Sequence, residues 1–459
     1  MIKQMKIAAL SGMVLAMSIH VKAQTEEGLL HDLWNKIEET YPGLASKESK
    51  INAAALNEYV TKGERLPQLK GQAQNTYGTY ESTMGSFFPQ AGLFNVNSSD
   101  NLSGTVFSPN TYASATIEWE LFSFGEKQNK SKAAKSKTYK AHSEKDTYIL
   151  TLKKDLFNRF FQLLYKESQW IWNSKNVERL HSVRGITASL ASAGIKSQAD
   201  SLLASSSYSQ ALGENEKIRG QKEAAMIKLL ELTGDDRVSV QTVMPNFLEP
   251  KQILTEPSRQ IDLNHPVLQT MVEAEEYLKY SSKAHKAAAL PSIHLMGGYA
   301  YRGTGIGREG TVSGRWKDGF SNTAKNILLG IGVTWNITDV YTKKQKGNSL
   351  KKDAESINFL NKQQELAMQS DLSAIQNKIT HQYVEVQQTK DAQEEAEKAY
   401  EMYLSRYKSG LMDLSTLLQV QQLLETAENK HIEAAFAYWT LLAGEAALTG
   451  DFDHLFNNF

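Results

Sequence analysis

The sequence predicts a mainly α-helical chain that also carries membrane-spanning β-strands and is built as a tandem repeat. Three observations lead to this fold class. Proline, tryptophan and glycine markers recur in the second half of the 459-residue chain, two segments alternate apolar and polar residues, and two very long segments lack proline and glycine. The expected unit, used twice, is a moderate helix, a pair of strands, a long helix, a tight turn and a long returning helix.

The repeat is visible in the spacing of its markers. Five pairs recur in order: Pro42 as Pro266, Pro67 as Pro291, Trp119 as Trp335, Gly194 as Gly410, and Gly234 as Gly450. The offset is 224 for the prolines and 216 for the other pairs, so the second repeat is shorter by a loop-sized deletion between Pro291 and Trp335. We therefore divide the chain into a signal segment (residues 1–23), a first repeat (24–258) and a second repeat (259–459).

The N-terminal segment has the three parts of a secretory signal peptide. Lys3 and Lys6 are basic, residues 7–19 are apolar, and Ala23 ends a small-residue cleavage site. The apolar stretch is too short for a transmembrane helix, and no later segment reaches 18 apolar residues. We expect cleavage after Ala23, and any membrane insertion must then use β-strands.

Composition excludes several classes of function. The 51 basic and 51 acidic residues balance, so no excess positive charge attracts nucleic acid. The chain has no cysteine, which rules out disulfides, a thiol nucleophile and a lipid anchor on cysteine. The histidines show no metal-ligand spacing, and the glycine-rich residues 303–307 precede no helix that could cradle a phosphate. We expect no enzyme activity, no cofactor and no bound metal.

Two segments read as strands with one apolar and one polar face. Residues 112–122 and 329–338 alternate with period two over about ten residues, the length of a tilted strand that crosses a bilayer. Trp119 and Trp335 lie near their ends, where a membrane aromatic belt is expected. Weaker strands are expected near 67–80 and 290–302, joined to their partners by loops at 81–110 and 303–325. Alternation by itself also fits a soluble sheet packed on a helix.

Two helices of unusual length are expected, from about residue 127 to 183 and from about 348 to 408. At 1.5 Å per residue they would reach roughly 85–90 Å. Apolar residues at spacings of three and four indicate coiled-coil packing, and His431 falls in such a stripe as a seam residue. Gly194 and Gly410 mark the turns, and Gly234 and Gly450 the C-caps of the returning helices.

Four membrane strands cannot close a barrel, and an open sheet edge is not tolerated in hydrocarbon. Two copies would give eight strands and a filled interior, whereas three would give twelve and an open lumen. The polar strand faces favour the larger number. We therefore expect a homotrimer with a 12-stranded β-barrel, continued by an α-barrel of the long helices.

With these features in order, the mature chain resembles a TolC-type outer-membrane efflux channel. The resemblance implies a passive duct that sits in outer-membrane lipid and extends into the periplasm. It also implies two partners, a periplasmic adaptor (membrane fusion protein) and an inner-membrane transporter of an efflux or type I secretion system. Drug, metal and protein export all remain open as its task.

The resemblance further implies which residues do the work. The adaptor-docking tips would be Gly194 and Ile195 in the first repeat, and Gly410 and Leu411 in the second. Arg406 resembles a basic residue of such tips, whereas the first repeat has Leu190 there. Both glycines are equally explained by the needs of a tight turn.

A periplasmic constriction lined by acidic residues is also implied. Asp200, six residues after Gly194, fits one acidic position, although it also fits the start of a helix. The second repeat has Thr416 and Gln419 where acids are expected, and Asp413 lies nearby at a different helical phase.

The alternative from another class is a soluble periplasmic coiled-coil scaffold or adaptor protein. The alternating strands with their tryptophans speak against it, because such a protein would carry a compact β-domain with its own core.

Overall fold

The computed structural model describes residues 28–79, 107–234, 239–252 and 261–459. The expected signal segment, most of the loop expected at 81–110 and the predicted boundary between the repeats at 258 lie outside these residues. Within the described part of the chain, no helix combines the length and the apolar character needed to cross a membrane. The chain divides into two compact units, which are described separately below.

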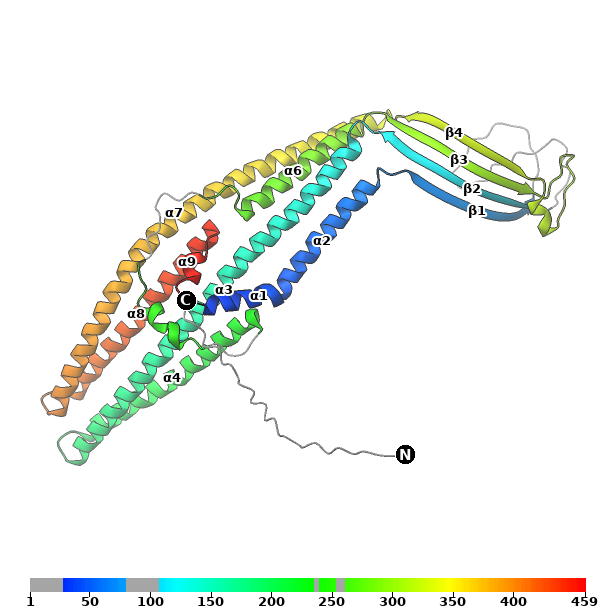
Figure 1. The fold of residues 1–459 in the computed structure, drawn as a ribbon. Coiled ribbons are helices and arrows are strands. Elements are labelled where there is room, and N and C mark those ends of the chain that lie inside the picture. Colours follow the sequence, from blue (N-terminus) through cyan, green and yellow to red (C-terminus); the bar gives the residue numbers. More distant parts are fainter. Residues whose placement is uncertain (1–27, 80–106, 235–238, 253–260) are drawn as a thin grey trace, which may run out of the picture. The chain divides into compact units, whose positions relative to one another are not determined.

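The first unit is made of residues 42–151 and 258–372 and contains the strands. Its elements, shown in Figure 1, are α2 (Pro42–Gly63), β1 (Gln68–Thr79), β2 (Phe107–Phe122), the start of α3 (Glu126–Ser192), α6 (Pro266–Ala287), β3 (Ser292–Thr304), the 3₁₀ helix η2 (Trp316–Phe320), β4 (Ala324–Thr334) and the start of α7 (Asp339–Lys408). We call it the sheet unit. It takes a helix, two strands and part of a long helix from each repeat.

The four strands form one antiparallel sheet in the order β1-β2-β3-β4. Leu69, Ile117, Gly297 and Leu329 lie in one row across it. Because side chains alternate along a strand, this row and every second row from it form the apolar face, which also carries Leu295, Ile331 and Val333. The opposite face is polar, with Gln72 opposite Ser114 and Lys70 opposite Thr116. Among the residues that the structure describes, β1 and β4 each pair on one side only.

The weaker strands are confirmed, but the predicted segment 329–338 is wrong beyond Thr334. Trp335 follows the end of β4, and the next residues form the start of α7 instead. The amide of Asn336 donates to Asp339 Oδ2 over 2.7 Å, and the Thr338 hydroxyl donates to Asn336 Oδ1 over 2.8 Å. These local bonds satisfy polar groups at the helix start, which a continued strand would not do.

Helix α7 also begins nine residues earlier than expected and includes Gly347. A Cβ at this position would lie 2.6 Å from Lys286 Cγ of α6. The Ser282 hydroxyl of α6 donates to the Gly347 carbonyl over 2.6 Å. The glycine is therefore not a helix end but a point of close approach between α6 and α7.

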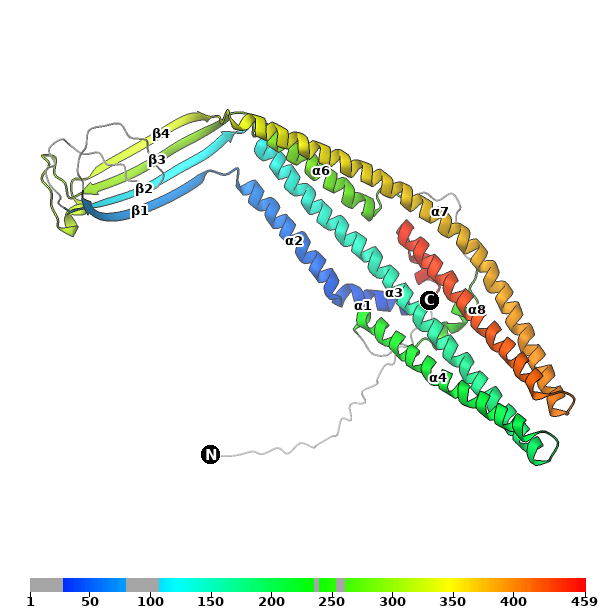
Figure 2. The same cartoon turned by 180° about the vertical axis from the view of Figure 1, so that it is seen from behind.

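The second unit, which we call the tip unit, is made of the remaining residues. It contains α1 (Leu29–Thr40), the end of α3, α4 (Gln198–Thr233), η1 (Gln241–Val243), α5 (Met244–Leu248), the end of α7, α8 (Leu414–Thr449) and α9 (Asp453–Phe456). Figures 1 and 2 show α3 with α4 and α7 with α8 as two antiparallel helix pairs, which confirms the predicted hairpins.

An aromatic core holds the tip unit together at the end away from its turns. Phe157, Phe160 and Phe161 of α3 pack with Trp439 of α8 and with Phe459, and all five side chains are almost fully buried. The Trp439 indole N–H donates to the Phe247 carbonyl of α5 over 3.0 Å. Each such aromatic side chain buries 150 Å² or more in typical proteins. This cluster is therefore a large part of the apolar core that joins α3 to α8.

The predicted coiled-coil stripes are confirmed as buried seams. Ile379 and Val386 of α7 and Leu424 and Tyr438 of α8 are buried. His431 of α8 is buried and stacks on Trp172 at a ring distance of 6.0 Å, and burial lowers the pKa of its imidazole. It is a neutral seam residue, as the sequence predicts.

Candidate functional site

The candidate site is the pair of turns at the free end of the tip unit. Gly194 and Gly410 both have φ of +74°, the left-handed region that disfavours side chains. Space is not the reason, because a Cβ at either position would meet nothing within 4 Å. The turns close in the same way, with the Ile195 amide donating to Leu190 and the Leu411 amide to Arg406. Both glycines are therefore needed by the backbone.

The returning helices start at equivalent residues but with different caps. Ser197 caps α4 by accepting from the Asp200 amide over 3.2 Å. Asp413 caps α8 and accepts from the Thr416 amide over 2.7 Å and from the Ser415 hydroxyl over 2.6 Å. These bonds, that of Ser415 first, lower the pKa of the Asp413 carboxyl to about 2. A charged cap at a helix N-terminus is favourable because it faces the positive end of the helix dipole.

A buried hydrogen bond joins the two helix pairs just behind the turns. Tyr407 of α7 is fully buried, and its hydroxyl lies 2.8 Å from Thr187 Oγ1 of α3. The Thr187 hydroxyl donates to the Val183 carbonyl, so the tyrosine is the donor between the two hydroxyls. Burial raises the pKa of Tyr407, and nearby Asp200 adds to the effect. The tyrosine stays protonated and the bond persists at physiological pH.

A second bond links the turns themselves. The Lys196 ammonium of the first turn donates to the Met412 carbonyl of the second over 2.9 Å. Around these bonds, apolar side chains of all four helices form a small core, which includes Val183, Ala204, Leu414 and Leu417. At the turns, the α3–α4 pair and the α7–α8 pair are thus held together by apolar packing and by two specific hydrogen bonds.

Further from the turns, a polar network ties α3 to α8. The Arg179 guanidinium forms a bidentate pair with the Glu428 carboxylate, at 2.9 and 2.7 Å, and both side chains are largely buried. Asn176 donates to Glu425 over 3.1 Å and accepts from Gln421. Burial is the main reason why the pKa of Glu425 is raised. Breaking such a desolvated pair leaves a charge without compensation.

The predicted docking residues lie on the outside of this arrangement. Ile195 is 63% exposed and Leu411 73% exposed. Arg406 is also exposed, one residue before the buried Tyr407. At the two turns these residues therefore present two exposed apolar side chains and one exposed cation beside the glycines. Their role in docking stays a prediction.

The predicted constriction residues divide into two groups. Asp413 and Thr416 are joined by capping bonds on α8, and Gln419 is exposed one turn later. Asp200 is half-buried on α4 and close enough to Tyr407 to affect its pKa. Asp413 therefore has a structural task of its own, and a role of the four residues in a constriction stays a prediction.

Trp119 and Trp335 lie at the junction of strands and helices in the sheet unit. The indole N–H of Trp119 donates to the Arg65 carbonyl over 2.9 Å, and that of Trp335 to the Ala289 carbonyl over 3.2 Å. The carbonyl one residue before each of these acceptors is bound by a lysine. Lys127 donates to the Glu64 carbonyl over 2.9 Å, and Lys343 donates to the Ala288 carbonyl over 3.0 Å. Each tryptophan–lysine pair occupies the same place in its repeat. We call this arrangement the junction clamp; both indoles also remain partly exposed, at 38% and 51%.

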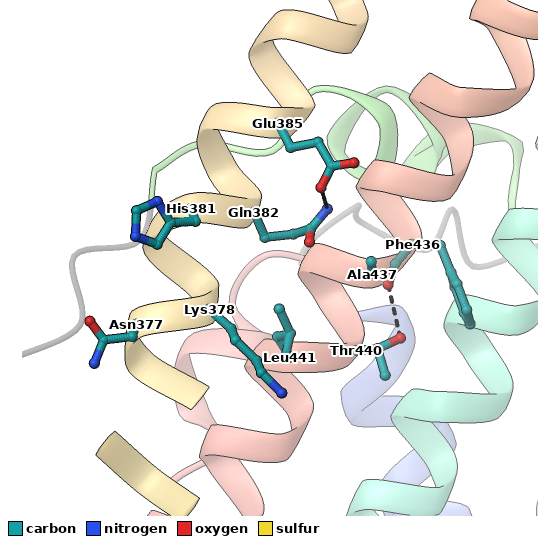
Figure 3. Close-up of a pocket in the computed structure, with 9 residues that line it drawn as sticks. All are labelled: Asn377, Lys378, His381, Gln382, Glu385, Phe436, Ala437, Thr440 and Leu441. Atoms are coloured by element: carbon teal, nitrogen blue, oxygen red, sulfur yellow. Dashed lines mark hydrogen bonds between the residues drawn. The ribbon is translucent and has the colours of Figure 1, made fainter. Parts of the chain in front are cut away.

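A groove of about 620 Å³ between α7 and α8 shows no catalytic arrangement (Figure 3). Gln382 donates to Glu385 over 2.8 Å, and Thr440 donates to the Phe436 carbonyl. His381 extends to the other side of α7 from Gln382, away from α8 (Figure 3). Within the described ranges, no three His, Asp or Glu side chains are grouped to hold a metal.

Sequence reasoning missed Thr187, Tyr407, Lys196 and the junction clamp. Tyr407 could have been noticed, because the first repeat has Ala191 at the equivalent position while the turns around it are alike. The partners of these residues lie far away in the chain, so no local pattern shows them.

Comparison with known proteins agrees with this geometry. The chain matches the family described as outer membrane efflux protein over residues 33–235 and 258–449. No curated protein matches it. Three similar solved structures are the outer-membrane channel OprN (17% identity, TM-score 0.74, 92% of this chain and 89% of that one), the Campylobacter jejuni outer membrane channel CmeC (14%, 0.73, 93% and 86%) and the Vibrio cholerae outer membrane protein VceC (13%, 0.73, 92% and 96%). At these identities the likeness shows the fold.

Proposed function

This chain belongs to the outer membrane efflux protein family, and we propose that three copies of it form a passive duct of a tripartite export system. The family is one of outer-membrane channels and not of enzymes, and the outer membrane is where the chain resides. The soluble scaffold considered above is not favoured by this membership.

The sheet unit supports the trimer. Its sheet has one apolar and one polar face, and its edge strands β1 and β4 each have one side that pairs with no other strand in the described part of the chain. In a membrane these groups need partners. Pairing β1 of one copy with β4 of the next would satisfy them, and three copies would give twelve strands around a polar lumen.

The tip unit supports a gate and a docking site for an adaptor. The exposed Ile195 and Leu411 offer apolar contacts to a partner helix, and Arg406 offers a charge that can select it. An adaptor that prefers separated helix pairs would stabilise an open duct, because binding shifts the equilibrium towards the state it fits. An inner-membrane transporter would supply the energy and the cargo.

The bond between Thr187 and Tyr407 carries the gating proposal. It joins α3 to α7 directly behind the turns, so the helix pairs cannot separate there without breaking it. Lys196 must also release the Met412 carbonyl. We infer that these two bonds hold the closed state, with Asp200, Asp413, Thr416 and Gln419 placed around the narrow end.

Single-channel conductance in a planar bilayer tests the proposal, with the mass of the detergent-purified oligomer measured in parallel. We expect a trimer with a small conductance, and a larger or more frequently open conductance for Tyr407→Phe. The control is Tyr403→Phe, one helical turn earlier on α7. A soluble monomer or dimer without conductance would overturn the duct, whereas a conducting trimer with equal behaviour of both variants would overturn only the gate.

A further inference from the structure

The loop between β3 and β4 folds back onto the apolar face of the sheet. A Cβ at Gly303 would lie 2.6 Å from the Gly319 carbonyl oxygen, and a Cβ at Gly319 would lie 2.9 Å from Pro109 Cβ. Gly303 and Pro109 alternate in register with Gly297 and Ile117, so they belong to the apolar face. Both are buried here. Glycine at these two positions lets η2 lie flat against β2 and β3, at the end of the sheet away from α3 and α6 (Figure 1).

Aromatic side chains surround η2. The Tyr77 hydroxyl donates to the Gly314 carbonyl over 3.0 Å, and its ring stacks on Phe107 at 5.6 Å and approaches Trp316 at 6.3 Å. Tyr77, Phe107, Trp316 and Phe320 are each about half exposed. Tyr77 and Trp316 carry polar atoms, and half-exposed Tyr and Trp are typical of the membrane interface, where one end of the ring is apolar and the other wet.

The distance along the strand places these rings at a second interface. Trp119 and Pro109 are ten residues apart on β2, which corresponds to about 33 Å along the strand. With a typical tilt near 40°, this becomes about 25 Å across the bilayer, the height of the apolar band of membrane barrels. If Trp119 is at the periplasmic interface, η2 is at the outer one.

Three cations lie on this loop and on the adjoining start of β4. The Arg315 side chain is 78% exposed, and its Nε donates to Asp318 Oδ2 over 3.0 Å, which orients the guanidinium. Lys317 of η2 is exposed. Lys325 pairs with Tyr301, which places it on the apolar face of β4. A lysine there can avoid hydrocarbon only by extending its ammonium towards the headgroups.

We propose that Arg315, Lys317 and Lys325 bind the phosphate groups of an outer-leaflet lipid whose acyl chains lie against the apolar face below η2. The ligand is a lipid headgroup and not free phosphate, because the cations lie at the upper edge of a surface that is otherwise apolar. This goes beyond export and depends only on the outer-membrane location. The loop would thereby set how deep each copy sits in the membrane.

Lipid binding to the detergent-solubilised protein tests the proposal. The probes are a fluorescent glycolipid with two phosphates, the same lipid without phosphates, and inorganic phosphate as competitor. Arg315→Gln/Lys317→Gln should bind the phosphorylated lipid about thirtyfold more weakly than the unmodified protein, since two cations near an anionic lipid surface together contribute about 2 kcal/mol. The control Lys378→Gln/Lys398→Gln removes two exposed charges of α7, outside this loop, and should bind normally.

Three results would overturn the proposal. The first is equal binding of the two lipids, and the second is full binding by the double variant. The third is displacement of the lipid by millimolar inorganic phosphate, which would show a simple anion site. Gly319→Leu gives a second approach, because the new side chain must displace η2 from Pro109. This variant should bind the lipids with and without phosphates equally, while its oligomer remains intact.

The position of the loop can be measured independently. Since the chain has no cysteine, Lys317→Cys and Lys398→Cys each provide one labelling site. In nanodiscs, a dye at residue 317 should be quenched by headgroup-labelled lipid, and a dye at residue 398 should not. Equal quenching at the two sites would contradict the placement of η2.

Discussion

Each repeat contains the same backbone turn between its two long helices, but the side chains at the two turns differ. Gly194 and Gly410 share one φ value, and the capping bonds fall on equivalent residues. The first repeat has Leu190 and Ala191 where the second has Arg406 and Tyr407. The glycine and the cap that the turn backbone requires are therefore present in both repeats. Contacts that serve a particular partner differ between them, and such differences point to functional residues.

The contacts between helix pairs show the same contrast. Arg179 and Glu428 join α3 of the first repeat to α8 of the second. The equivalent residues on α7 and α4 are Glu395 and Leu212, which cannot form this pair. The contact between α3 and α8 thus contains a buried ion pair. The equivalent surfaces of α7 and α4 have no such pair. In a ring of three copies, those surfaces would be the ones that face a neighbouring copy.

The largest expected effect comes from breaking the ion pair. Arg179→Met should lower the free energy of unfolding by about 3–5 kcal/mol, because Glu428 remains buried without its partner. Thermal and denaturant unfolding in detergent measure this. Glu395→Gln, at the equivalent exposed position, should change stability by less than about 0.5 kcal/mol. If the two variants lose the same stability, the contrast between the seams is unfounded; Arg179→Met/Glu428→Met should recover much of the loss.

The turns should respond equally in the two repeats. Gly194→Val and Gly410→Val should each cost about 1–3 kcal/mol, since a β-branched residue at positive φ is strained even where there is space for its side chain. Unfolding measurements give the size of each loss. Export assays then separate the repeats: the variant that loses export beyond its loss of stability identifies the tip that docks. Equal loss of export would mean that both tips are used alike.

The junction clamp should also respond equally. Trp119→Phe and Trp335→Phe keep an aromatic ring but remove the indole N–H donor, so the loss of the hydrogen bond should cost about 0.5–1.5 kcal/mol in each variant. The loss should be present in detergent and in lipid, because the acceptors are the Arg65 and Ala289 carbonyls of the chain itself. A loss seen only in lipid would assign the tryptophans to the aromatic belt alone.

The smallest effect is a difference in pH response between the two caps. The pKa of Asp413 is held at about 2, below its ordinary value of 3.8. Its capping bonds therefore stabilise α8 fully above pH 4, and the stabilisation disappears as the pH falls through about 2. Ser197 does not titrate. Hydrogen exchange at the start of α8 should accelerate over this range, while that at α4 should not; Asp413→Ser should abolish the difference.

The sequence by itself determined the repeated architecture, because the signals are local. Alternation along 112–122 and glycine at 194 and 410 each report on a few neighbouring residues, and the structure confirms them. Where a local pattern continued past its element, as at Trp335, capping bonds at the start of α7 ended the strand. The predicted start of the second long helix at about residue 348 was also wrong, since a glycine at a close helix contact, such as Gly347, looks the same in sequence as one that ends a helix.

Only the tertiary structure decided how these elements are tied together. Thr187 and Tyr407 are 220 residues apart, and Arg179 and Glu428 are 249 apart. Trp335 meets the Ala289 carbonyl, and η2 lies on the apolar face because Gly303 and Gly319 allow it. Such contacts depend on which faces meet after folding, and burial then sets the pKa and the strength of each polar bond. Local periodicity shows which face of an element is apolar but not which element packs against it. The bonds between the helix pairs and the position of η2 on the sheet could therefore be found only in three dimensions.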